Sequence, residues 1–329
     1  GSTGGSSNTQ VTFFGVRGST PCHGDNIARY GGNTSCVAVR VPGEPPLFFD
    51  LGTGARYFGA TQPQDGTFRG TCLLSHLHWD HTPGLPSFSP LLHEGSELDV
   101  YAPAQEDGRS VADVINAVIR PPLFPVTIDQ LPGMVRFHDT ADREFDVGGI
   151  RVISRLVPHV GPTLGYRIEW KGRSVAYLSD HQQPYDGSFS MSDGARELAE
   201  GADLLIHDSQ YTSHEFVQKS TWGHCTIDYA IWLAQHCNVG RLALFHHDPS
   251  RTDAALDDVS ADGVAIAVTG FGCALGAGPG GAVRRDRPRC PVVGASATTC
   301  SCVVCGGVVR GVHRAVAGEA GAGPPPTVR

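Results

Sequence analysis

The chain has 329 residues, of which 40% are hydrophobic, and this is enough for one large α/β domain with a sizeable core. It contains no run of about 18 apolar residues, so no transmembrane helix is predicted. The formal net charge of -8 disfavours a general nucleic-acid-binding surface, because phosphate binding requires a basic field.

The chain begins with small polar residues and then runs into short β-rich segments. Residues 1–10 lack the charged and apolar stretches of a signal peptide, and we expect them to be disordered or left over from cloning. Apolar residues at helical spacing predict a helix over Arg109–Ile119. Short apolar runs that end in Gly, Pro or Asp predict the strands Val11–Gly15, Ser35–Val41, Leu47–Asp50, Thr71–Ser75 and Leu98–Tyr101.

A second β-rich half follows, with helices towards its end. Helices are predicted around Ala195–Glu200 and Thr226–His236. Two β-rich halves with helices beside them indicate two sheets packed face to face, with the helices outside. The strands predicted in this half are Val135–His138, Glu144–Asp146, Ile150–Leu156, Thr163–Glu169, Ser174–Leu178, Asp203–His207 and Arg241–Phe245.

The composition changes after about residue 261. Residues 261–329 are dominated by Gly, Ala, Val, Arg and Pro, a mixture that rarely builds a core. We expect this tail to be disordered or to derive from a non-native reading frame, and residues 11–260 to form the folded domain. The tail cysteines Cys300, Cys302 and Cys305 form one tight cluster without a second well-spaced pair, so a zinc knuckle is not predicted.

The strongest functional pattern is the segment Leu73–His81, in which an apolar strand leads directly into four potential metal ligands. Alternation along an extended segment places His76 and His78 on one side, and Asp80 and His81 fall in the turn that follows. Imidazole nitrogens with one carboxylate suit zinc, although manganese or iron would accept the same ligands. A polar loop with chance histidines is the alternative, which the position directly after a buried strand disfavours.

Further candidate ligands follow three later strands. Each of them alone has an ordinary explanation, as a surface histidine or as an aspartate in a turn. Together, at successive strand ends, they indicate a single site. The three are His159, Asp180 and His246.

This ligand series resembles that of the metallo-β-lactamase superfamily over residues 11–257. Asp50, in the segment Phe49–Gly54, is similar to the aspartate–glycine turn that precedes the first ligand loop of that family. The resemblance implies a four-layer αββα sandwich of the α/β (α+β) class. It further implies one metal on His76, His78 and His159, a second on Asp80, His81 and His246, Asp180 bridging both, and Asp50 orienting the ligand loop from behind.

Two zinc ions per chain are therefore expected. Two cations about 3.5–4 Å apart lower the pKa of a bridging water, hold the hydroxide in line with an electrophile and bind the oxygens that gain charge. The last ligand is ambiguous by one residue, because His247 is adjacent to His246. We favour His246, because the segment Phe245–Pro249 resembles the Thr-His-x-Ser-Pro form of relatives.

Two later motifs resemble the ribonuclease Z branch of the superfamily. Leu205–Ser209 is similar to its His-Glu-Ala-Thr segment, and Gly223–Thr226 to its Gly-His-Ser-Thr loop, with a cysteine in place of the serine. The resemblance implies that Asp208 orients His224 and that His224 protonates the leaving oxygen. The alternative for His224 is a histidine that merely precedes a helix. The candidate catalytic residues are thus Asp80, His224 and Asp208.

Two glycine-rich loops, Gly15–Pro21 and Tyr30–Ser35, resemble the first loops of small phosphodiesterases in this superfamily, including phosphoribosyl cyclic phosphodiesterases. Such turns can bring backbone N–H groups close to an anionic substrate, or can be tight turns and nothing more. Arg251 is a candidate phosphate contact, with a solvated loop arginine as its alternative.

The sequence predicts a dinuclear metal-dependent hydrolase, and favours a phosphodiesterase that uses a metal-bridging hydroxide on a small or cyclic phosphodiester. Thioester or lactone hydrolysis, tRNA 3′-end processing and a non-enzymatic metal-binding role are the alternatives. The acidic charge disfavours nucleic acid as a partner. We expect a cytoplasmic protein without a membrane contact, and a homodimer is left open.

Overall fold

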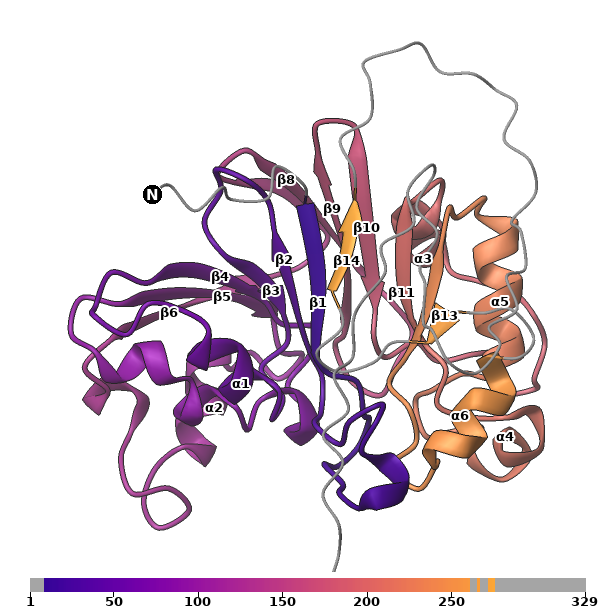
Figure 1. Ribbon diagram of the computed structural model, residues 1–329, viewed down its shortest axis with the longest axis horizontal. Coiled ribbons are helices and arrows are strands. Elements are labelled where there is room, and N and C mark those ends of the chain that lie inside the picture. Colours follow the sequence, from indigo (N-terminus) through magenta and orange to yellow (C-terminus); the bar gives the residue numbers. More distant parts are fainter. Residues whose placement is uncertain (1–8, 261–264, 267–271, 276–329) are drawn as a thin grey trace, which may run out of the picture. The chain divides into compact units, whose positions relative to one another are not determined.

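Two seven-stranded sheets form the centre of the computed structural model, which describes residues 9–260, 265–266 and 272–275 (Figure 1). In spatial order the first sheet consists of β14 (Gly272–Leu275), β1 (Thr9–Gly15), β2 (Cys36–Arg40), β3 (Leu47–Phe49), β4 (Arg69–Leu73), β5 (Glu97–Pro103) and β6 (Met134–Thr140). The second consists of β13 (Ala265–Ile266), β12 (Leu242–Phe245), β11 (Leu204–Asp208), β10 (Arg173–Leu178), β9 (Leu164–Trp170), β8 (Ile150–Leu156) and β7 (Arg143–Val147).

Each sheet is antiparallel in one part and parallel in the other. The pairs β3–β4, β4–β5 and β5–β6 are parallel, as are β10–β11, β11–β12 and β12–β13. The strands β8, β9 and β10 alternate in direction, so β8 runs the same way as β10. The carboxyl ends of β8, β10, β11 and β12 therefore meet at one edge of the second sheet.

Helices cover the outer faces of both sheets, with α1 and α2 on the first sheet and α3 and α5 on the second (Figure 1). Their bounds are α1 (Ala55–Ala60), α2 (Val111–Val118), α3 (Asp193–Ala199), α4 (Ser213–Lys219), α5 (Ile227–His236) and α6 (Asp253–Ser260). Short 3-10 helices are η1 (Asp25–Ile27), η2 (Trp79–His81), η3 (Leu85–Ser87), η4 (Ser89–Leu92) and η5 (Ile128–Gln130). The resulting four layers confirm the predicted αββα sandwich.

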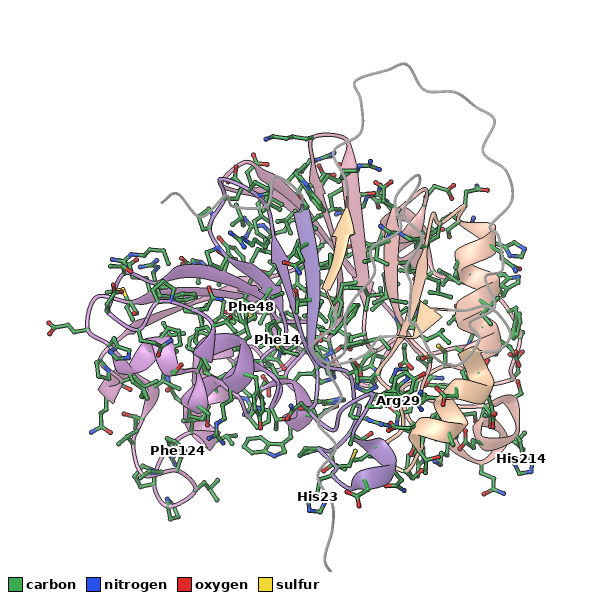
Figure 2. The ribbon with its side chains drawn as sticks, in the orientation of Figure 1. Phe14, His23, Arg29, Phe48, Phe124 and His214 are labelled. Carbon is green, nitrogen blue, oxygen red and sulfur yellow. The ribbon has the colours of Figure 1, made fainter. Side chains whose placement is uncertain are left out.

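Three apolar clusters hold the layers together. The central one joins the facing sides of the two sheets, where the rings of Phe49 and Tyr177 stack with centroids 4.5 Å apart. A second lies between the first sheet and its helices, where Phe48 and Phe14 both contact the ring of Phe58 (Figure 2). The third lies between the second sheet and its helices α3 and α5 and includes Tyr229. Burying such rings between layers is the main favourable contribution to a fold of this kind.

Hydroxyl groups define where four of the helices begin. The side chains of Ser110, Ser192, Thr212 and Thr226 each accept a hydrogen bond from a backbone N–H in the first turn of α2, α3, α4 and α5. These bonds satisfy N–H groups that have no partner within the helix. The capping residue Thr226 lies two residues after His224, one of the candidate site residues, and so fixes the start of α5 close to it.

Strands continue beyond residue 260, where the sequence predicted only a tail. The strand β13 pairs with β12, and β14 pairs with β1, so each extends one end of a sheet. Segments of two and four residues are too short to show a period of two, which explains why the sequence pattern did not indicate them. The expectations for residues 1–8 and for the cysteine cluster around Cys300 lie outside the described residues. No helix in the described part of the chain has the length and apolarity that a membrane span requires.

Candidate metal centre

The strand directions bring all the candidate ligands to one edge of the sandwich. The first ligand loop leaves β4 in the first sheet, and its last three residues form the 3-10 turn η2. The other candidates follow β8, β10 and β12, whose carboxyl ends meet at the same edge of the second sheet. The cluster therefore lies between the two sheets and is lined by both.

The first group of donor atoms comes from three histidines. One ring nitrogen from each of His76, His78 and His159 lies within 4.8 Å of the others. The Nε2 atom of His159 is 3.2 Å from Nδ1 of His78. Two nitrogens bound to one tetrahedral zinc ion lie about 3.3 Å apart, given Zn–N distances of about 2.0–2.1 Å.

The second group consists of Asp80, His81 and His246, whose donor atoms also lie within 4.8 Å of one another. The Oδ2 atom of Asp80 is 3.2 Å from Nε2 of His81 and 3.1 Å from Nε2 of His246. The Nε2 atoms of His81 and His246 are 3.2 Å apart, and the planes of the two rings are nearly parallel, with an angle of 16° between them.

Asp180 stands between the two groups, with one oxygen directed to each. Its Oδ1 atom is 3.8 Å from Nε2 of His76 and 3.7 Å from Nε2 of His159. Its Oδ2 atom is 3.1 Å from Nε2 of His81 and 3.4 Å from Nε2 of His246. A carboxylate so placed can bridge two cations.

Two buried polar atoms in this cluster have no hydrogen-bond partner, Nε2 of His76 and Oδ2 of Asp180. Leaving such atoms unpaired is costly in an interior, unless a ligand satisfies them. Nitrogen and carboxylate donors facing a common space fit divalent transition metals. The residues present thus fit two cations, with His76, His78 and His159 on one side and Asp80, His81 and His246 on the other.

The opposite nitrogen of several imidazoles is held by an acceptor, which fixes the orientation of the ring. The Nδ1 atoms of His81, His159 and His246 lie 2.7 Å from Oδ2 of Asp50, 2.6 Å from the carbonyl of Gly223 and 2.8 Å from Oε1 of Gln210. Each Nε2 atom is left to face the cluster. Outer hydrogen bonds of this kind are typical of metal-binding histidines.

Asp50 lies behind the first ligand loop and is hydrogen-bonded to it. It accepts hydrogen bonds from the backbone N–H and the hydroxyl of Ser75, from Nδ1 of His81 and from the hydroxyl of Tyr177. Its φ of 59° and the φ of 57° at His246 lie in the left-handed region, which non-glycine residues rarely adopt. Such strain is common where function dictates the backbone.

The glycine-rich loop Gly15–Pro21 acts on a ligand of the cluster. The backbone N–H of Ser19 donates to Oδ2 of Asp80 at 2.7 Å, and the Ser19 hydroxyl accepts from Nε2 of Gln210. A Cβ atom at Gly18 would lie only 2.3 Å from the ring of His246, so this position requires glycine. Ser19 lies in a loop that the sequence indicated, whereas Gln210 and Tyr177 carry no motif and were not predicted from the sequence.

His224 and Asp208 lie together beside the cluster. The Nδ1 atom of His224 lies 2.8 Å from Oδ2 of Asp208, and its ring stacks on His246 with centroids 4.9 Å apart. Asp208 also accepts from the backbone N–H groups of His181 and Gln210, so it is held firmly in place. Asp208 is thereby engaged as an acceptor for His224.

Two residues that the sequence left ambiguous lie away from the cluster. The ring of His247 packs edge-on against Tyr30, and its backbone pairs with the loop at Val16 and Gly18. The guanidinium of Arg251 donates to Glu215 and to the carbonyl of Gln210, which favours a structural role over a phosphate contact.

The electrostatics of the cluster suit a cation. Burial lowers the pKa of His76 well below its usual value and that of His159 to about 4, so both rings favour the neutral form that binds metal. Burial alone would lower the pKa of His81, but the carboxylates of Asp80, Asp180 and Asp50 raise it. At His224, burial also lowers the pKa, but the Asp208 carboxylate raises it, and the pKa of His224 is raised above its usual value. The carboxylates thus stabilise positive charge in the space between them.

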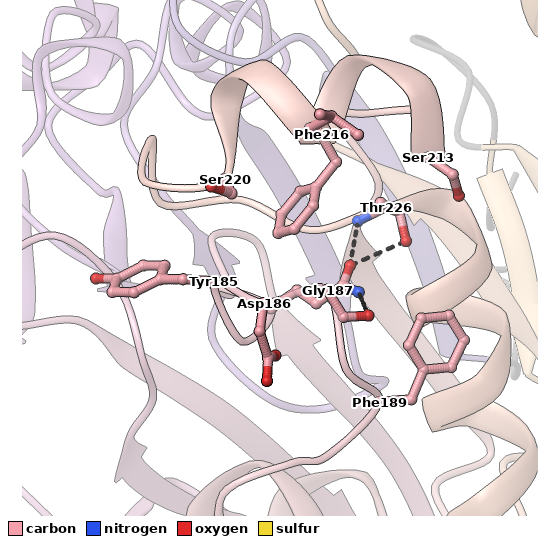
Figure 3. A pocket seen from close by; sticks show the side chains of 10 residues that line it. Tyr185, Asp186, Gly187, Phe189, Ser213, Phe216, Ser220 and Thr226 are labelled. Carbon is pink, nitrogen blue, oxygen red and sulfur yellow. Dashed lines mark hydrogen bonds between the residues drawn. The ribbon is translucent and has the colours of Figure 1, made fainter.

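A separate cavity of about 300 Å³ lies beside the loop that carries His224 (Figure 3). It is bounded by Phe189, Phe216 and Thr226, and the Oε1 atom of Gln183 accepts from both the N–H and the hydroxyl of Thr226. None of the residues lining it belongs to the two donor groups. The candidate metal centre is therefore distinct from this cavity.

Known proteins are similar to this chain in sequence. The model of the β-lactamase superfamily domain matches residues 61–247. The ribonuclease Z of Synechococcus sp. (strain WH7803) is 27% identical over 290 residues, which cover 73% of this chain and 85% of that protein. The ribonuclease Z of Lactococcus lactis subsp. lactis is 26% identical over 221 residues, covering 53% of this chain and 69% of that protein.

Solved structures show the same fold. The metallo-β-lactamase fold protein YhfI from Bacillus subtilis superposes with a TM-score of 0.62 at 18% identity, covering 82% of this chain and 99% of that one. A diphosphatase from the PhnP family gives a TM-score of 0.58 at 19% identity, covering 80% and 97%. Because the family model spans more than half of the chain and the fold agrees with it, the chain belongs to the β-lactamase superfamily and is a metal-dependent hydrolase of the metallo-β-lactamase fold.

Proposed function

We propose that this hydrolase is a dinuclear phosphodiesterase that acts on a small or cyclic phosphodiester. The observation that carries the proposal is the pair His224 and Asp208 beside the donor cluster, with Nδ1 of His224 2.8 Å from the carboxylate. The thiolate that leaves a thioester needs a dedicated acid of this kind less strongly than the alkoxide that leaves a phosphodiester does. The relatives named ribonuclease Z and the neighbour described as a diphosphatase also support phosphate ester chemistry.

In this proposal each side chain has a defined task. His76, His78 and His159 hold one cation, Asp80, His81 and His246 hold the other, and Asp180 bridges them. Zinc is the expected metal because most donors are imidazole nitrogens, and manganese or iron fits the same set. When bound, the two cations would supply an activated water and stabilise charge on the phosphoryl oxygens.

The surrounding residues orient the substrate and manage its protons. His224 donates a proton to the leaving oxygen, and Asp208 positions its ring by holding Nδ1. Asp50 and Gln210 hold His81 and His246 with their Nε2 atoms towards the cluster. The net charge of -8 favours a small substrate over a polynucleotide, because a long phosphate backbone requires a basic surface.

The test combines metal analysis with a substrate panel. We expect two divalent metals per chain and turnover of bis-p-nitrophenyl phosphate and cyclic nucleotides that exceeds turnover of thioesters and lactones. His224→Ala should lower kcat on diesters with alkoxide leaving groups by about 10²–10⁴-fold while the metal content is unchanged. His214→Ala, an exposed histidine of α4, is the matched control (Figure 2).

Other outcomes would reassign the function. Faster turnover of a thioester or lactone, with His224→Ala as active as the parent, would favour that class of hydrolase. Precursor tRNA cleaved as efficiently as small diesters would favour 3′-end processing. A metal-loaded protein inert towards the whole panel would indicate a binding role.

A further inference from the structure

Among the described candidate ligands, His78 alone is an exposed residue; His159 is partly buried, but its side chain is only 1% exposed. His76, Asp80, His81, Asp180 and His246 are all buried, whereas His78 is an exposed residue whose Nδ1 atom still faces the cluster. A substrate that reaches the donor atoms therefore passes His78 and its neighbours.

Two tryptophans flank this opening. Trp79 directly follows His78, and Trp222 directly precedes Gly223, whose carbonyl holds the ring of His159 at 2.6 Å. The Nε2 atom of His159 is 3.2 Å from Nδ1 of His78. The ring of His159 therefore lies between the loop of Trp79 and the loop of Trp222. A Cβ atom at Gly223 would lie 2.5 Å from the His159 ring, so the second loop packs directly on this imidazole.

Both indoles are far more exposed than a tryptophan in a fold normally is. Trp79 is 62% exposed and Trp222 is 61% exposed. Val160, which directly follows His159, is 50% exposed and adds apolar surface beside that ligand. Exposed apolar surface at the rim of a polar site marks a place where a ligand packs.

The surroundings of Trp222 favour a planar ligand over an apolar chain. The ammonium group of Lys219, which also lies 3.4 Å from Oδ2 of Asp248, is 5.6 Å from the centroid of the Trp222 ring and 4.9 Å from that of Tyr211. An acyl chain would require an apolar channel, whereas flat exposed rings beside a cation suit the stacking of a heteroaromatic base. The acidic charge of the chain argues for one nucleotide rather than a polymer.

We propose that Trp79 and Trp222 stack against the base of the substrate, which makes a nucleoside-bearing phosphodiester the substrate class of this centre. The proposal rests on the proposed phosphodiesterase function for the reaction, but the base-binding role concerns these two side chains alone. The diester would sit at the cluster, and its base would lie outward between the loops of Trp79 and Trp222. The two tryptophans are therefore specificity-determining residues and take no part in the bond-breaking step.

A matched pair of substrates tests the role of the base. Adenosine 2′,3′-cyclic phosphate and methyl ribofuranoside 2′,3′-cyclic phosphate differ only at C1′, which carries adenine in the first and a methoxy group in the second. Trp79→Ala and Trp222→Ala should each raise KM for the adenosine substrate about ten-fold, and leave kcat/KM for the base-free substrate within about two-fold of the parent. Trp→Phe variants should recover most of the loss, and Tyr57→Ala, which removes an exposed ring from α1, should change neither substrate.

A binding measurement separates this inference from the proposed function. Calorimetry on the metal-loaded protein should show adenosine 5′-monophosphate binding about ten-fold or more tightly than ribose 5-phosphate, with the difference lost in both alanine variants. Equal affinities, or alanine variants that weaken both ligands equally, would overturn the role of the tryptophans even if diesters are hydrolysed. A preference that the variants abolish, in a protein that hydrolyses no diester, would leave the base site standing and remove the phosphodiesterase proposal.

Discussion

At the scale of single residues, the site depends as much on what holds the imidazoles as on the imidazoles themselves. The Nδ1 atom of His246 lies 2.8 Å from Oε1 of Gln210, and Gln210 in turn donates to the hydroxyl of Ser19. Ser19 then donates through its backbone to Asp80. A ring of contacts therefore links two candidate ligands of the same cation through residues that bind no metal.

Removing Gln210 should weaken metal binding without unfolding the protein. Gln210→Ala leaves Nδ1 of His246 without its acceptor, and the loss of such an outer bond typically costs about 10–100-fold in metal affinity. Titration with zinc against a chelator of known affinity measures this change. Gln210→Glu keeps an acceptor oxygen in reach and should restore most of the affinity, while the exposed Gln64→Ala should behave as the parent.

An affinity for zinc that is unchanged in Gln210→Ala would contradict the ligand assignment of His246. If Gln210→Glu also binds zinc more weakly than Gln210→Ala, the new carboxylate disturbs the cluster instead of supporting it.

The residues that the sequence could indicate are those whose chemistry is local. Four potential ligands lie within Leu73–His81, and the later candidates each follow an apolar strand, so pattern and strand ends were sufficient. Gln210 and Tyr177 could not be found in this way, because Gln210 supports a ligand 36 positions away and Tyr177 donates to Asp50 across 127 positions. Only the folded arrangement of the two sheets brings these partners together.

At the scale of helices and strands, the alternation of apolar residues predicted the strands that face the central core to within one or two residues. Ile150–Leu156 was predicted with the bounds that the structure has, and its buried residues face both neighbouring layers. The helices α1, α4 and α6 were not predicted, whereas α2 and α3, of eight and seven residues, were. Helices this short make about two turns, so their apolar spacing is a weak signal. Their starts are set by turn and capping interactions instead.

The edge of the first sheet offers a test of electrostatics within one pair of strands. Asp99 on β5 lies opposite Arg136 on β6, which binds both carboxylate oxygens at 2.8 Å, and Nε2 of His138 is 2.7 Å from Oδ1. The hydrogen bonds from Arg136 hold the pKa of Asp99 below its usual value. The folded state thus binds fewer protons here than the unfolded state.

This pair should stabilise the edge at neutral pH and not in acid. A carboxyl group with a lowered pKa contributes stability above its unfolded pKa of about 3.9, and that stability disappears as the pH falls through the lower folded value. Asp99→Asn should therefore lower the free energy of unfolding by about 1 kcal/mol at pH 7, and the difference should vanish at the most acidic pH that the fold tolerates. Urea unfolding across this pH range measures the difference in the free energy of unfolding, with Asp129→Asn, at an exposed residue, as control. A difference that does not change with pH would rule out the ion pair as its origin.

At the scale of the whole molecule, residues from both sheets form the candidate centre. His76, His78, Asp80 and His81 come from the loop after β4 of the first sheet, whereas His159, Asp180 and His246 follow strands of the second. Each donor group combines residues from both sheets. Cations bound here would therefore hold together the two halves of the sandwich, in addition to the apolar core between them.

This arrangement predicts that metal removal destabilises the entire fold. A ligand that binds only the folded state adds about 2.7 kcal/mol per site at a free concentration 100 times its Kd, so two occupied sites add about 5 kcal/mol. For a domain of this size we expect Tm to fall by about 10–20 °C on chelation, as measured by calorimetry, and to recover when zinc is restored.

His78→Ala should lose about half of this response, since the second donor group does not include His78, whereas His214→Ala should keep all of it. Because both sheets supply ligands, near-UV circular dichroism and fluorescence should report one cooperative transition; a Tm that does not respond to chelation would mean that the cluster does not join the sheets through metal at all.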